Sequence, residues 1–398
     1  MNTVDYLIIG GGIIGLTIAV EIKRRDPSFS IVVIEKEKSC GMHASGRNSG
    51  ILHAGFYYTN NSLKAKLTRD GNKMMKDYCR ERKIIVNNCG KLVVTQNYDQ
   101  LKTLKELYKR GQSNNVELEW ISEDEARRIE PNVITHGSAL WSPTTASVNP
   151  ESVMSSLVKD AISLGVKIQT DTAYIGRKGN NNHIITSKGA IECGYVINCA
   201  GLYADRVALD FNFSKSYRIV PFKGVYLYAD INTRMPKTNI YPVPDLDWPF
   251  LGVHYTVTFD GRVKIGPTAI PAFWRENYNG LQNFDIYELS EILSREFDLF
   301  ITNKFNFRKI AIQEMKKYRK KNIINDAKKL LKGVSFSSWG APGIRAQLMD
   351  LRDNSLVMDF VYEGDKHSFH VLNAVSPGFT CSLSFAKYMV DEIEKLNA

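Results

Sequence analysis

The feature that most constrains this chain is a glycine-rich loop close to its N-terminus. The apolar run Tyr6–Ile9 suits a buried parallel strand, and Gly10, Gly12 and Gly15 follow it at the G-x-G-x-x-G spacing. Helical periodicity continues through Ile14–Arg24. Glycines at this spacing let the backbone turn tightly, approach a pyrophosphate closely and pack the helix onto the strand. The helix N-terminus stabilises phosphate charge, so the loop predicts a dinucleotide-binding unit.

An acidic residue completes this pattern. A second β-rich run, Ser30–Ile34, ends at Glu35, twenty residues after Gly15. A carboxylate at this place accepts hydrogen bonds from both hydroxyls of an adenosine ribose. An ordinary glycine-rich turn between a strand and a helix would leave Glu35 unexplained. We therefore expect a Rossmann-like α/β domain that begins with these residues.

Length and composition indicate a globular protein of two domains. The chain has 398 residues, of which 43% are hydrophobic and 24% are charged. Its six cysteines form no C-x-x-C pair and no metal-like spacing, which suits reduced thiols in a cytoplasm and indicates no metal site. Three glycines interrupt the N-terminal apolar run, so we expect no signal peptide. No apolar stretch approaches the ~20 residues that cross a bilayer.

The net charge of +10 is concentrated in the basic segment 308–332. Ten basic residues lie there with Glu314 and Asp326, so the segment carries +8 and the rest of the chain +2. Apolar residues recur between the lysines at helical spacing. The segment either lies on an anionic membrane surface or is a solvated helix whose apolar side packs on the core. No aromatic or arginine-rich platform accompanies the lysines, so we expect no nucleic acid partner.

The most distinctive stretch is 41–58, GMHASGRNSGILHAGFYY. It is too rich in glycine, serine, asparagine and histidine for a core element. In a nucleotide-binding domain it would follow the second strand and run beside the cofactor towards the reaction centre. Its polar groups suit contact with a polar ligand.

This stretch, followed by Ser62–Ala65 (SLKA), closely resembles the L-2-hydroxyglutarate oxidase/dehydrogenase family. These are FAD enzymes of the D-amino-acid-oxidase and glycerol-3-phosphate-oxidase superfamily. The resemblance runs from residue 4 to about 396, with a loose match only in the basic segment. It implies an α/β fold with an α+β second domain. A discontinuous FAD-binding domain (1–88, 145–216 and 340–398) would stand beside an antiparallel-sheet substrate domain (89–144 and 217–339).

The resemblance also implies a set of residues that bind FAD. They come from the glycine loop, the second strand, the distinctive stretch, a later Ala-Gly turn, the G-x-R-A-Q motif and the S-P-G-F-T motif before the last helix. These residues are Gly10, Gly12, Gly15, Glu35, Lys36, Ser45, Arg47, Asn48, Ser49, Ala200, Gly201, Gly343, Ser376, Gly378, Phe379 and Thr380.

Flavin oxidation moves a hydride from a carbon to flavin N5, while another group takes the hydroxyl or amine proton. His53 is the candidate base, because the family places this histidine beside the flavin and imidazole titrates near neutral pH. His254 is the second candidate and either lines the pocket or orients an aromatic loop. We expect Arg345 to grip a substrate carboxylate in bidentate fashion, the alternative being a surface salt bridge. Tyr58 joins these three as a substrate-binding residue.

We therefore expect oxidation of a small 2-hydroxy acid, L-2-hydroxyglutarate by resemblance, to the 2-oxo acid. Lys223, Val225, Val257 and Asn149 depart from the family pattern and leave the substrate open. The alternatives are a glycerol-3-phosphate oxidase or dehydrogenase, an amino-acid or secondary-amine oxidase, and a flavin-binding protein without turnover. Oxygen or a quinone would accept the electrons. We expect a cytoplasmic enzyme, peripheral on the inner face of the membrane if the basic segment binds lipid.

Overall fold

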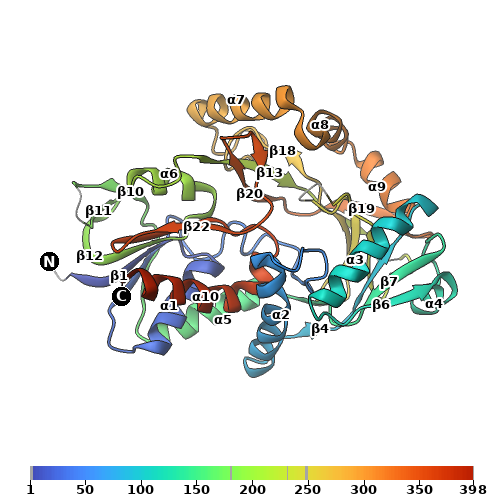
Figure 1. Ribbon diagram of the computed structural model, residues 1–398, viewed down its shortest axis with the longest axis horizontal. Helices are drawn as coiled ribbons and strands as arrows, with labels where there is room; N and C mark the ends of the chain where they lie inside the picture. The colour runs from blue at the N-terminus through green and yellow to red at the C-terminus, as the bar shows by residue number, and fades with distance from the viewer. Residues whose placement is uncertain (1–2, 180–181, 231, 247–249, 398) are drawn as a thin grey trace. The chain divides into compact units, whose positions relative to one another are not determined.

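The computed structural model describes residues 3–179, 182–230, 232–246 and 250–397. The chain forms two compact units, each assembled from separated stretches (Figure 1). Unit 1 comprises Met1–Asn48, Pro150–Ile219 and Ala346–Ala398, and unit 2 comprises Ser49–Asn149 and Val220–Arg345. The chain passes between the units within β13 (Tyr217–Gly224) and again within β20 (Gly343–Asp350).

Unit 1 is built on a mainly parallel sheet in the order β10-β11-β12-β1-β2-β9, and β12 also pairs with β23, which pairs with β22. Ile8 of β1 lies between Ile197 of β12 and Val33 of β2 in parallel register. Strands buried on both faces need continuous apolar runs, and β1 and β2 supply them. The strands of this sheet are β1 (Val4–Ile9), β2 (Ile31–Ile34), β9 (Lys167–Gln169), β10 (Tyr174–Arg177), β11 (His183–Thr186), β12 (Gly189–Asn198), β22 (Val361–Gly364) and β23 (Ser368–Asn373).

Helices cover this sheet, and two of them come from opposite ends of the sequence. The N-terminal helix α1 packs against both α5 and the C-terminal helix α10 (Figure 1). Apolar residues recur at three- and four-residue spacing along α10, and Ala386, Met389 and Ile393 among them are buried, so this stripe faces the core up to the last turn, where Leu396 is exposed. The remaining elements of unit 1 are α1 (Ile13–Arg25), α5 (Pro150–Ser163), η2 (Gly201–Tyr203), α6 (Ala204–Asp210), β21 (Ser355–Leu356) and α10 (Gly378–Asn397).

Unit 2 is also built on an eight-stranded sheet, which is mostly antiparallel and has the order β19-β14-β17-β16-β15-β5-β7-β6. Side chains alternate across it, and one face carries a hydrophobic core that includes Leu92, Ile240, Tyr255 and Ile265. Its strands are β5 (Lys91–Val94), β6 (Glu119–Ser122), β7 (Ser138–Ser142), β14 (Leu227–Ala229), β15 (Asn239–Pro242), β16 (His254–Val257), β17 (Val263–Gly266) and β19 (Phe336–Trp339).

Smaller elements surround this sheet. Ser122 and Glu125 have the S-x-x-E spacing of a capping box, and they form one at the start of α4. Ser122 Oγ accepts from the Glu125 backbone N–H, while the Glu125 carboxylate accepts from the Ser122 N–H. The other elements are β3 (Ile51–Leu52), β4 (Val86–Asn87), β8 (Ala146–Val148), β18 (Ile270–Pro271), α2 (Leu63–Glu81), η1 (Tyr98–Gln100), α3 (Leu101–Ser113), α4 (Glu123–Ile129), α7 (Ile286–Thr302), η3 (Lys304–Asn306), α8 (Phe307–Lys316) and α9 (Lys320–Lys328).

The boundary expected for the FAD-binding domain differs from the observed one. Residues 49–88, expected there, lie in unit 2. The reason is pairing: β3 and β4 both pair with β8 in a small antiparallel sheet, and β8 belongs to unit 2. Residues 145–149 and 340–345 also lie in unit 2, whereas residues 217–219 lie in unit 1.

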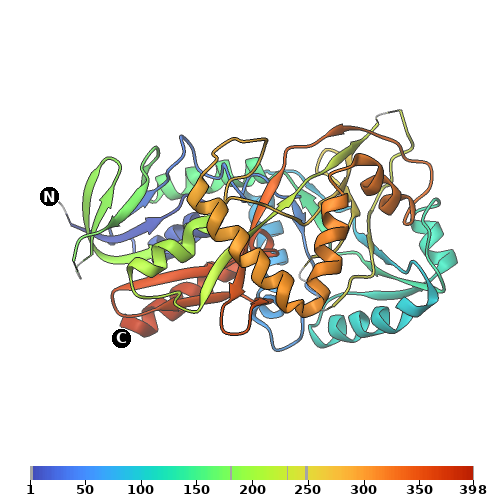
Figure 2. The ribbon, with the colours of Figure 1, turned by 90° about the horizontal axis from the view of Figure 1, so that it is seen from above.

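The basic segment is two helices rather than the one that the apolar spacing predicts. Ile323, Ala327, Leu330 and Leu331, in and just after α9, are buried in the core of unit 2. This half of the segment is therefore a solvated helix packed on the core. The other half, α8, is the neighbour of α7, and Figure 2 shows these two orange helices in sequence. Within the described residues no helix is both long and apolar enough to cross a membrane.

Candidate active site

The glycine loop of unit 1 has a shape that only glycine permits. Gly10 has a φ of +110°. A Cβ on it would lie 2.4 Å from the carbonyl oxygen of Cys199, the residue that follows the neighbouring strand β12. A Cβ on Gly15 would lie 2.1 Å from the carbonyl oxygen of Gly10. The first glycine therefore makes the turn, and the third lets α1 begin directly against β1.

Glu35 ties this loop to the end of β2. One carboxylate oxygen accepts from the Gly11 N–H and the other from the Glu37 N–H, both at 2.9 Å. The side chain is buried, so these bonds fix its position beside the loop. A carboxylate oxygen accepts more than one hydrogen bond, so Glu35 keeps acceptor capacity for a ribose hydroxyl.

The stretch after β2 wraps the N-terminus of α1. Ser45 Oγ accepts from the Ile13 N–H at 2.9 Å, and Asn48 Nδ2 donates to the Ser45 carbonyl at 2.7 Å. Arg47 Nε donates to the Met42 carbonyl at 2.8 Å. The first turn of α1 carries no acidic side chain, so the positive end of its dipole is not neutralised from within. This end suits a phosphate.

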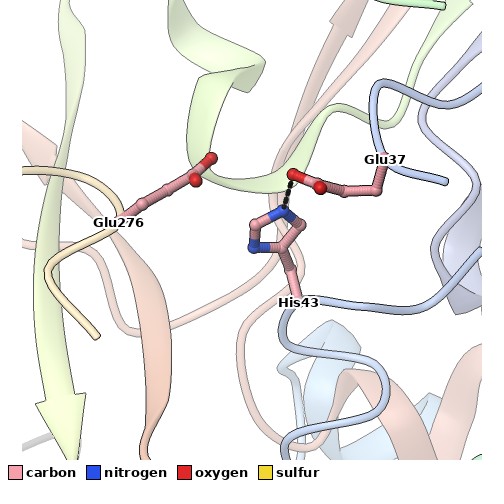
Figure 3. A group of neighbouring side chains, drawn as sticks. All are labelled: Glu37, His43 and Glu276. Atoms are coloured by element: carbon pink, nitrogen blue, oxygen red, sulfur yellow. Dashed lines mark hydrogen bonds and ion pairs between the residues drawn. The ribbon is translucent and has the colours of Figure 1, made fainter. Parts of the chain in front are cut away.

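His43, which no sequence pattern singled out, lies in the same stretch after β2. His43 Nε2 lies 2.9 Å from a carboxylate oxygen of Glu37 (Figure 3). Lys36 Nζ lies 2.6 Å from that oxygen, and the two partners hold the pKa of the Glu37 carboxyl below its usual range. Glu276, also drawn in Figure 3, belongs to unit 2 and accepts from Asn283 Nδ2 at 2.8 Å.

The other expected cofactor residues of unit 1 lie at two chain turns. Ala200 and Gly201 follow β12, where Asn198 Oδ1 accepts from the Ala200 N–H at 3.1 Å and Gly201 has a φ of +55°. Ser376 lies two residues before α10, whose first turn holds Gly378, Phe379 and Thr380 and no acidic side chain. Unit 1 thus offers two helix N-termini and a glycine cradle, a donor set that fits the pyrophosphate and ribose of a dinucleotide.

The candidate catalytic residues His53, His254 and Arg345 all lie in unit 2. His254 is on the large sheet, and strand alternation puts polar or aromatic residues of the neighbouring strands on the same face, opposite the core that contains Leu92 and Tyr255. This face carries Lys91 on β5, Tyr241 on β15, His254 on β16 and Lys264 on β17. All four side chains are buried.

His53 follows β3 and is held by its backbone. Asn72 Nδ2 of α2 donates to the carbonyl groups of Leu52 and His53, at 3.0 and 3.1 Å. The imidazole is 9% exposed, and its Nδ1 lies 3.5 Å from Lys91 Nζ. Burial, together with the charge of Lys91, holds the pKa of His53 well below its usual value. His53 is therefore a neutral imidazole at neutral pH.

Lys91 is a site residue that sequence reasoning missed. Its side chain is fully buried, and its Nζ lies 4.4 Å from the ring centroid of Tyr241, 5.1 Å from that of Tyr57 and 5.4 Å from that of Phe56. Burial lowers its pKa to about 7. The only signal in the sequence is a lysine inside the apolar strand CGKLVVT.

His254 stacks on Tyr241 and keeps one nitrogen for other partners. Its Nδ1 lies 2.8 Å from the carbonyl oxygen of Gly252, which only accepts, so Nδ1 carries the proton and Nε2 is an acceptor. Burial lowers the pKa of His254 to about 3, and the charges of Lys91, Arg345 and Lys264 add to this effect. The ring is thus a neutral member of the same cluster.

Arg345 does not form the salt bridge that was its alternative. Its Nη1 donates to the Thr268 carbonyl at 2.9 Å, and the guanidinium lies 5.1 Å from the ring centroid of Phe250. Within the described residues no carboxylate lies within 4.0 Å of it. Burial lowers the pKa of Arg345. The guanidinium has further N–H groups besides the one that bonds the Thr268 carbonyl.

Three further predicted residues, Tyr58, Ser49 and Gly343, also lie in unit 2. Tyr58 adjoins Tyr57 and Tyr241, and its carbonyl accepts from Asn114. Ser49 Oγ accepts from the Ile51 N–H at 3.5 Å, a local turn contact. Gly343 begins β20, two residues before Arg345.

The fold and the two groups of residues define a flavin-dependent oxidase or dehydrogenase. The family model for FAD dependent oxidoreductases matches residues 5–392, and the chain belongs to this family. It is an FAD-dependent oxidoreductase.

Curated relatives narrow the comparison. The chain is 37% identical to the mitochondrial L-2-hydroxyglutarate dehydrogenase of Nematostella vectensis, over 98% of this chain and 90% of that protein. It is 33% identical to the L-2-hydroxyglutarate dehydrogenase of Escherichia coli K12, over 99% of this chain and 94% of that protein. Its fold is similar to that of L-α-glycerophosphate oxidase from Mycoplasma pneumoniae, with a TM-score of 0.76 and 20% identity over 99% and 95% of the two chains.

Proposed function

We propose that this enzyme oxidises the CH–OH group of L-2-hydroxyglutarate to the ketone of 2-oxoglutarate, with FAD as the hydride acceptor. The observation that carries the proposal is a pair of cations without a described counter-ion, buried Lys264 and half-buried Arg345. Both charges lower the pKa of His254, and neither has a described carboxylate within 4.0 Å. Buried charges are costly unless paired, so the pair suits a ligand with more than one negative charge. The dicarboxylate in the names of the relatives is such a ligand.

The residues of unit 1 would hold the cofactor. The glycine loop and the N-terminus of α1 would bind the pyrophosphate, and Glu35 would bind the ribose. The N-terminus of α10 would stabilise negative charge on the reduced ring. Bound FAD supplies an acceptor for hydride at N5.

The residues of unit 2 would hold and deprotonate the substrate. Arg345 has guanidinium N–H groups beyond the one that bonds Thr268, and it would fix a carboxylate in a bidentate contact. Neutral His53 would take the hydroxyl proton. His254 would offer its bare Nε2 to a substrate donor, and Tyr58 would border the pocket.

The experiment that tests this function is anaerobic reduction of the bound flavin. The holoenzyme is mixed with L-2-hydroxyglutarate, other 2-hydroxy acids, glycerol 3-phosphate and N-methyl amino acids, and flavin bleaching is followed. We expect L-2-hydroxyglutarate to bleach the flavin fastest, with its one-carboxylate analogue 2-hydroxybutyrate much slower. Faster bleaching by glycerol 3-phosphate or by an amine would overturn the proposal. Likeness to a glycerophosphate oxidase supports the fold alone and does not favour that substrate.

The electron acceptor and location form the second part of the proposal. Helices α7 and α8 expose large apolar side chains, with Phe297 62%, Ile301 55% and Ile312 51% exposed. Two exposed lysines of α8 lie on the same side of the helix as Ile312. Lys309 is three residues before Ile312, and Lys316 is four residues after it. An apolar surface fringed by cations suits the headgroup region of an anionic membrane, where a quinone acceptor would be dissolved. The enzyme would thus bind membranes peripherally.

A further inference from the structure

The contact between Lys91 and His53 has chemical consequences beyond charge. Among the described residues, the polar atom that lies within hydrogen-bond distance of Lys91 Nζ is Nδ1 of His53. The other neighbours of the ammonium are the ring faces of Phe56, Tyr57 and Tyr241. A buried charge without an opposite charge is costly, and an apolar side chain of similar volume often gives an equally stable or more stable protein. A purely structural role therefore does not explain a lysine at this position.

The titratable neighbours of Lys91 give it no negative partner near neutral pH. Burial raises the pKa values of Tyr57, Tyr241 and Cys89, so all three stay protonated. His254 is neutral as well and carries its proton on Nδ1, towards Gly252. Among the described groups around Lys91, His53 is therefore the one that exchanges protons with it.

The protonation of Lys91 decides which nitrogen of His53 carries hydrogen. An ammonium at Lys91 only donates, so Nδ1 must accept and the ring proton lies on Nε2. If Lys91 is a neutral amine, it accepts a hydrogen bond from Nδ1–H of His53, and Nε2 then carries no proton. Only the second arrangement lets His53 Nε2 accept a proton from a substrate.

We propose that His53 and Lys91 form a two-residue proton relay in which Lys91 is the final acceptor. The step rests on the function proposed above. The substrate O–H bond breaks as an Nε2–H bond forms, and the Nδ1–H bond breaks as a third N–H bond forms on Lys91. Bound FAD would accept the electron pair of the substrate C–H bond, and the C=O bond would form. Lys91 acts through His53 and is a positioning residue.

The acid strengths agree with this direction of transfer. The pKa of Lys91, at about 7, lies above that of His53, which burial holds well below its usual value. A proton that enters at His53 therefore comes to rest on Lys91. The ring faces of Tyr241, Tyr57 and Phe56 stabilise the resulting ammonium.

The test is the tautomer of His53, read by nitrogen NMR of the ¹⁵N-histidine-labelled holoenzyme between pH 6 and 9. We expect the ring proton to move from Nε2 to Nδ1 as the pH rises through about 7. Lys91→Met should abolish this switch. Lys264→Met removes another buried lysine from the same sheet face and should leave the switch intact. A wild-type tautomer that does not change over this range overturns the relay, whether or not the variants fold.

Kinetics give the second readout. Wild-type kcat/KM should rise with pH through about 7 and then level. Lys91→Met should lose this rise and about 10²–10⁴-fold in kcat/KM, the usual weight of general base catalysis. Lys91→Arg should be as slow at every pH, because its permanent cation keeps the proton on His53 Nε2. A normal pH profile in Lys91→Met would overturn the relay. A tautomer switch in an enzyme that no 2-hydroxy acid reduces would support the relay and reject the proposed substrate.

Discussion

The imidazole of His254 lies flat on the phenol ring of Tyr241, with the ring centroids 3.7 Å apart and the planes 19° from parallel. The same tyrosine ring lies 4.4 Å from Lys91 Nζ. One aromatic side chain therefore positions a histidine and a cation on two different strands, β16 and β5. Tyr241 contributes no reacting atom, yet its ring contacts both the proposed proton acceptor Lys91 and the proposed substrate-binding residue His254.

This arrangement predicts different outcomes for two substitutions of Tyr241. Tyr241→Phe keeps the ring and should change kcat/KM little. Tyr241→Ala should destabilise the fold by about 3–5 kcal/mol, as loss of a buried aromatic ring does, and kcat/KM should fall because His254 and Lys91 lose their support. Denaturant unfolding and steady-state kinetics measure the two effects. Normal kinetics in a folded Tyr241→Ala variant would show that the stacking has no catalytic role.

Glu35→Ala should weaken FAD retention. The substitution removes the acceptor for two backbone N–H groups that hold the glycine loop, at Gly11 and Glu37. Each unsatisfied buried donor costs about 1–3 kcal/mol. The released flavin is measured by fluorescence after gel filtration. Glu21→Ala, which removes a partly buried partner of Arg25 on the same unit, serves as the control and should keep FAD.

Arg345→Lys should lower kcat/KM by the equivalent of about 1.5–3 kcal/mol, the usual strength of hydrogen bonds to charged groups. A lysine is a point charge and cannot grip a carboxylate with a planar fork. The FAD content, read from the absorbance spectrum, should stay unchanged. If the variant loses flavin and keeps normal kinetics after reconstitution, Arg345 serves the cofactor and the substrate assignment is wrong.

The stability of the protein should rise with pH between about 7 and the ordinary lysine range. The pKa of buried Lys91 lies at about 7 and that of Lys264 at about 8, against 10.5 for a free lysine. In this window the unfolded chain holds protons that the folded chain lacks, so raising the pH favours the folded state. Lys91→Met should flatten this rise and increase stability at pH 6 by a few kcal/mol, about 1.4 kcal/mol for each unit of pKa shift. Urea unfolding at several pH values measures both.

Membrane binding through α7 and α8 predicts sedimentation with anionic liposomes at low salt and release at high salt, because ionic screening shortens the attraction. Charge reversal of exposed Lys309, Lys316 and Lys321 should abolish sedimentation and leave activity with a soluble dye intact. Lys317 is unsuitable for reversal, because it is buried and paired with Glu314.

The matched control for this experiment is reversal of Lys102, Lys105 and Lys109, which are exposed on α3 and change the net charge equally. This variant should still sediment with the liposomes. If wild-type protein stays in the supernatant at low salt, the exposed apolar side chains of α7 and α8 serve another purpose.

Local patterns predicted the features whose causes are local. The glycine loop, the Glu35 position and the capping box at Ser122 each depend on residues close in sequence, and each is found in the structure. The stripe of α10 depends on helical period alone and is also found. In contrast, Lys91 is buried because β5 lies between β15 and β7. That pairing joins residues about 150 positions apart, and no local pattern reports it.

The same limit explains two other differences. Periodicity does not say which neighbour covers an apolar stripe, so the spacing in 308–332 did not separate core-packed α9 from exposed α8. The pairing of β3 and β4 with β8 put residues 49–88 into unit 2, and strands this short carry no clear signal. The contact of His43 with Glu37 depends on how the irregular stretch after β2 turns back on itself, and no residue spacing in the sequence marks it.

The return of β23 and α10 to the first unit sets an order of events during synthesis. The ribosome makes β1, α1 and β12 long before residues 346–398, yet β12 needs β23 as its neighbour and α1 needs α10 as its cover. Until then a strand edge and an apolar helix face stay open on the nascent chain, where they invite wrong pairing and chaperone binding. The sheet and helix layer of unit 1 are therefore complete only after residues 346–398 have left the ribosome.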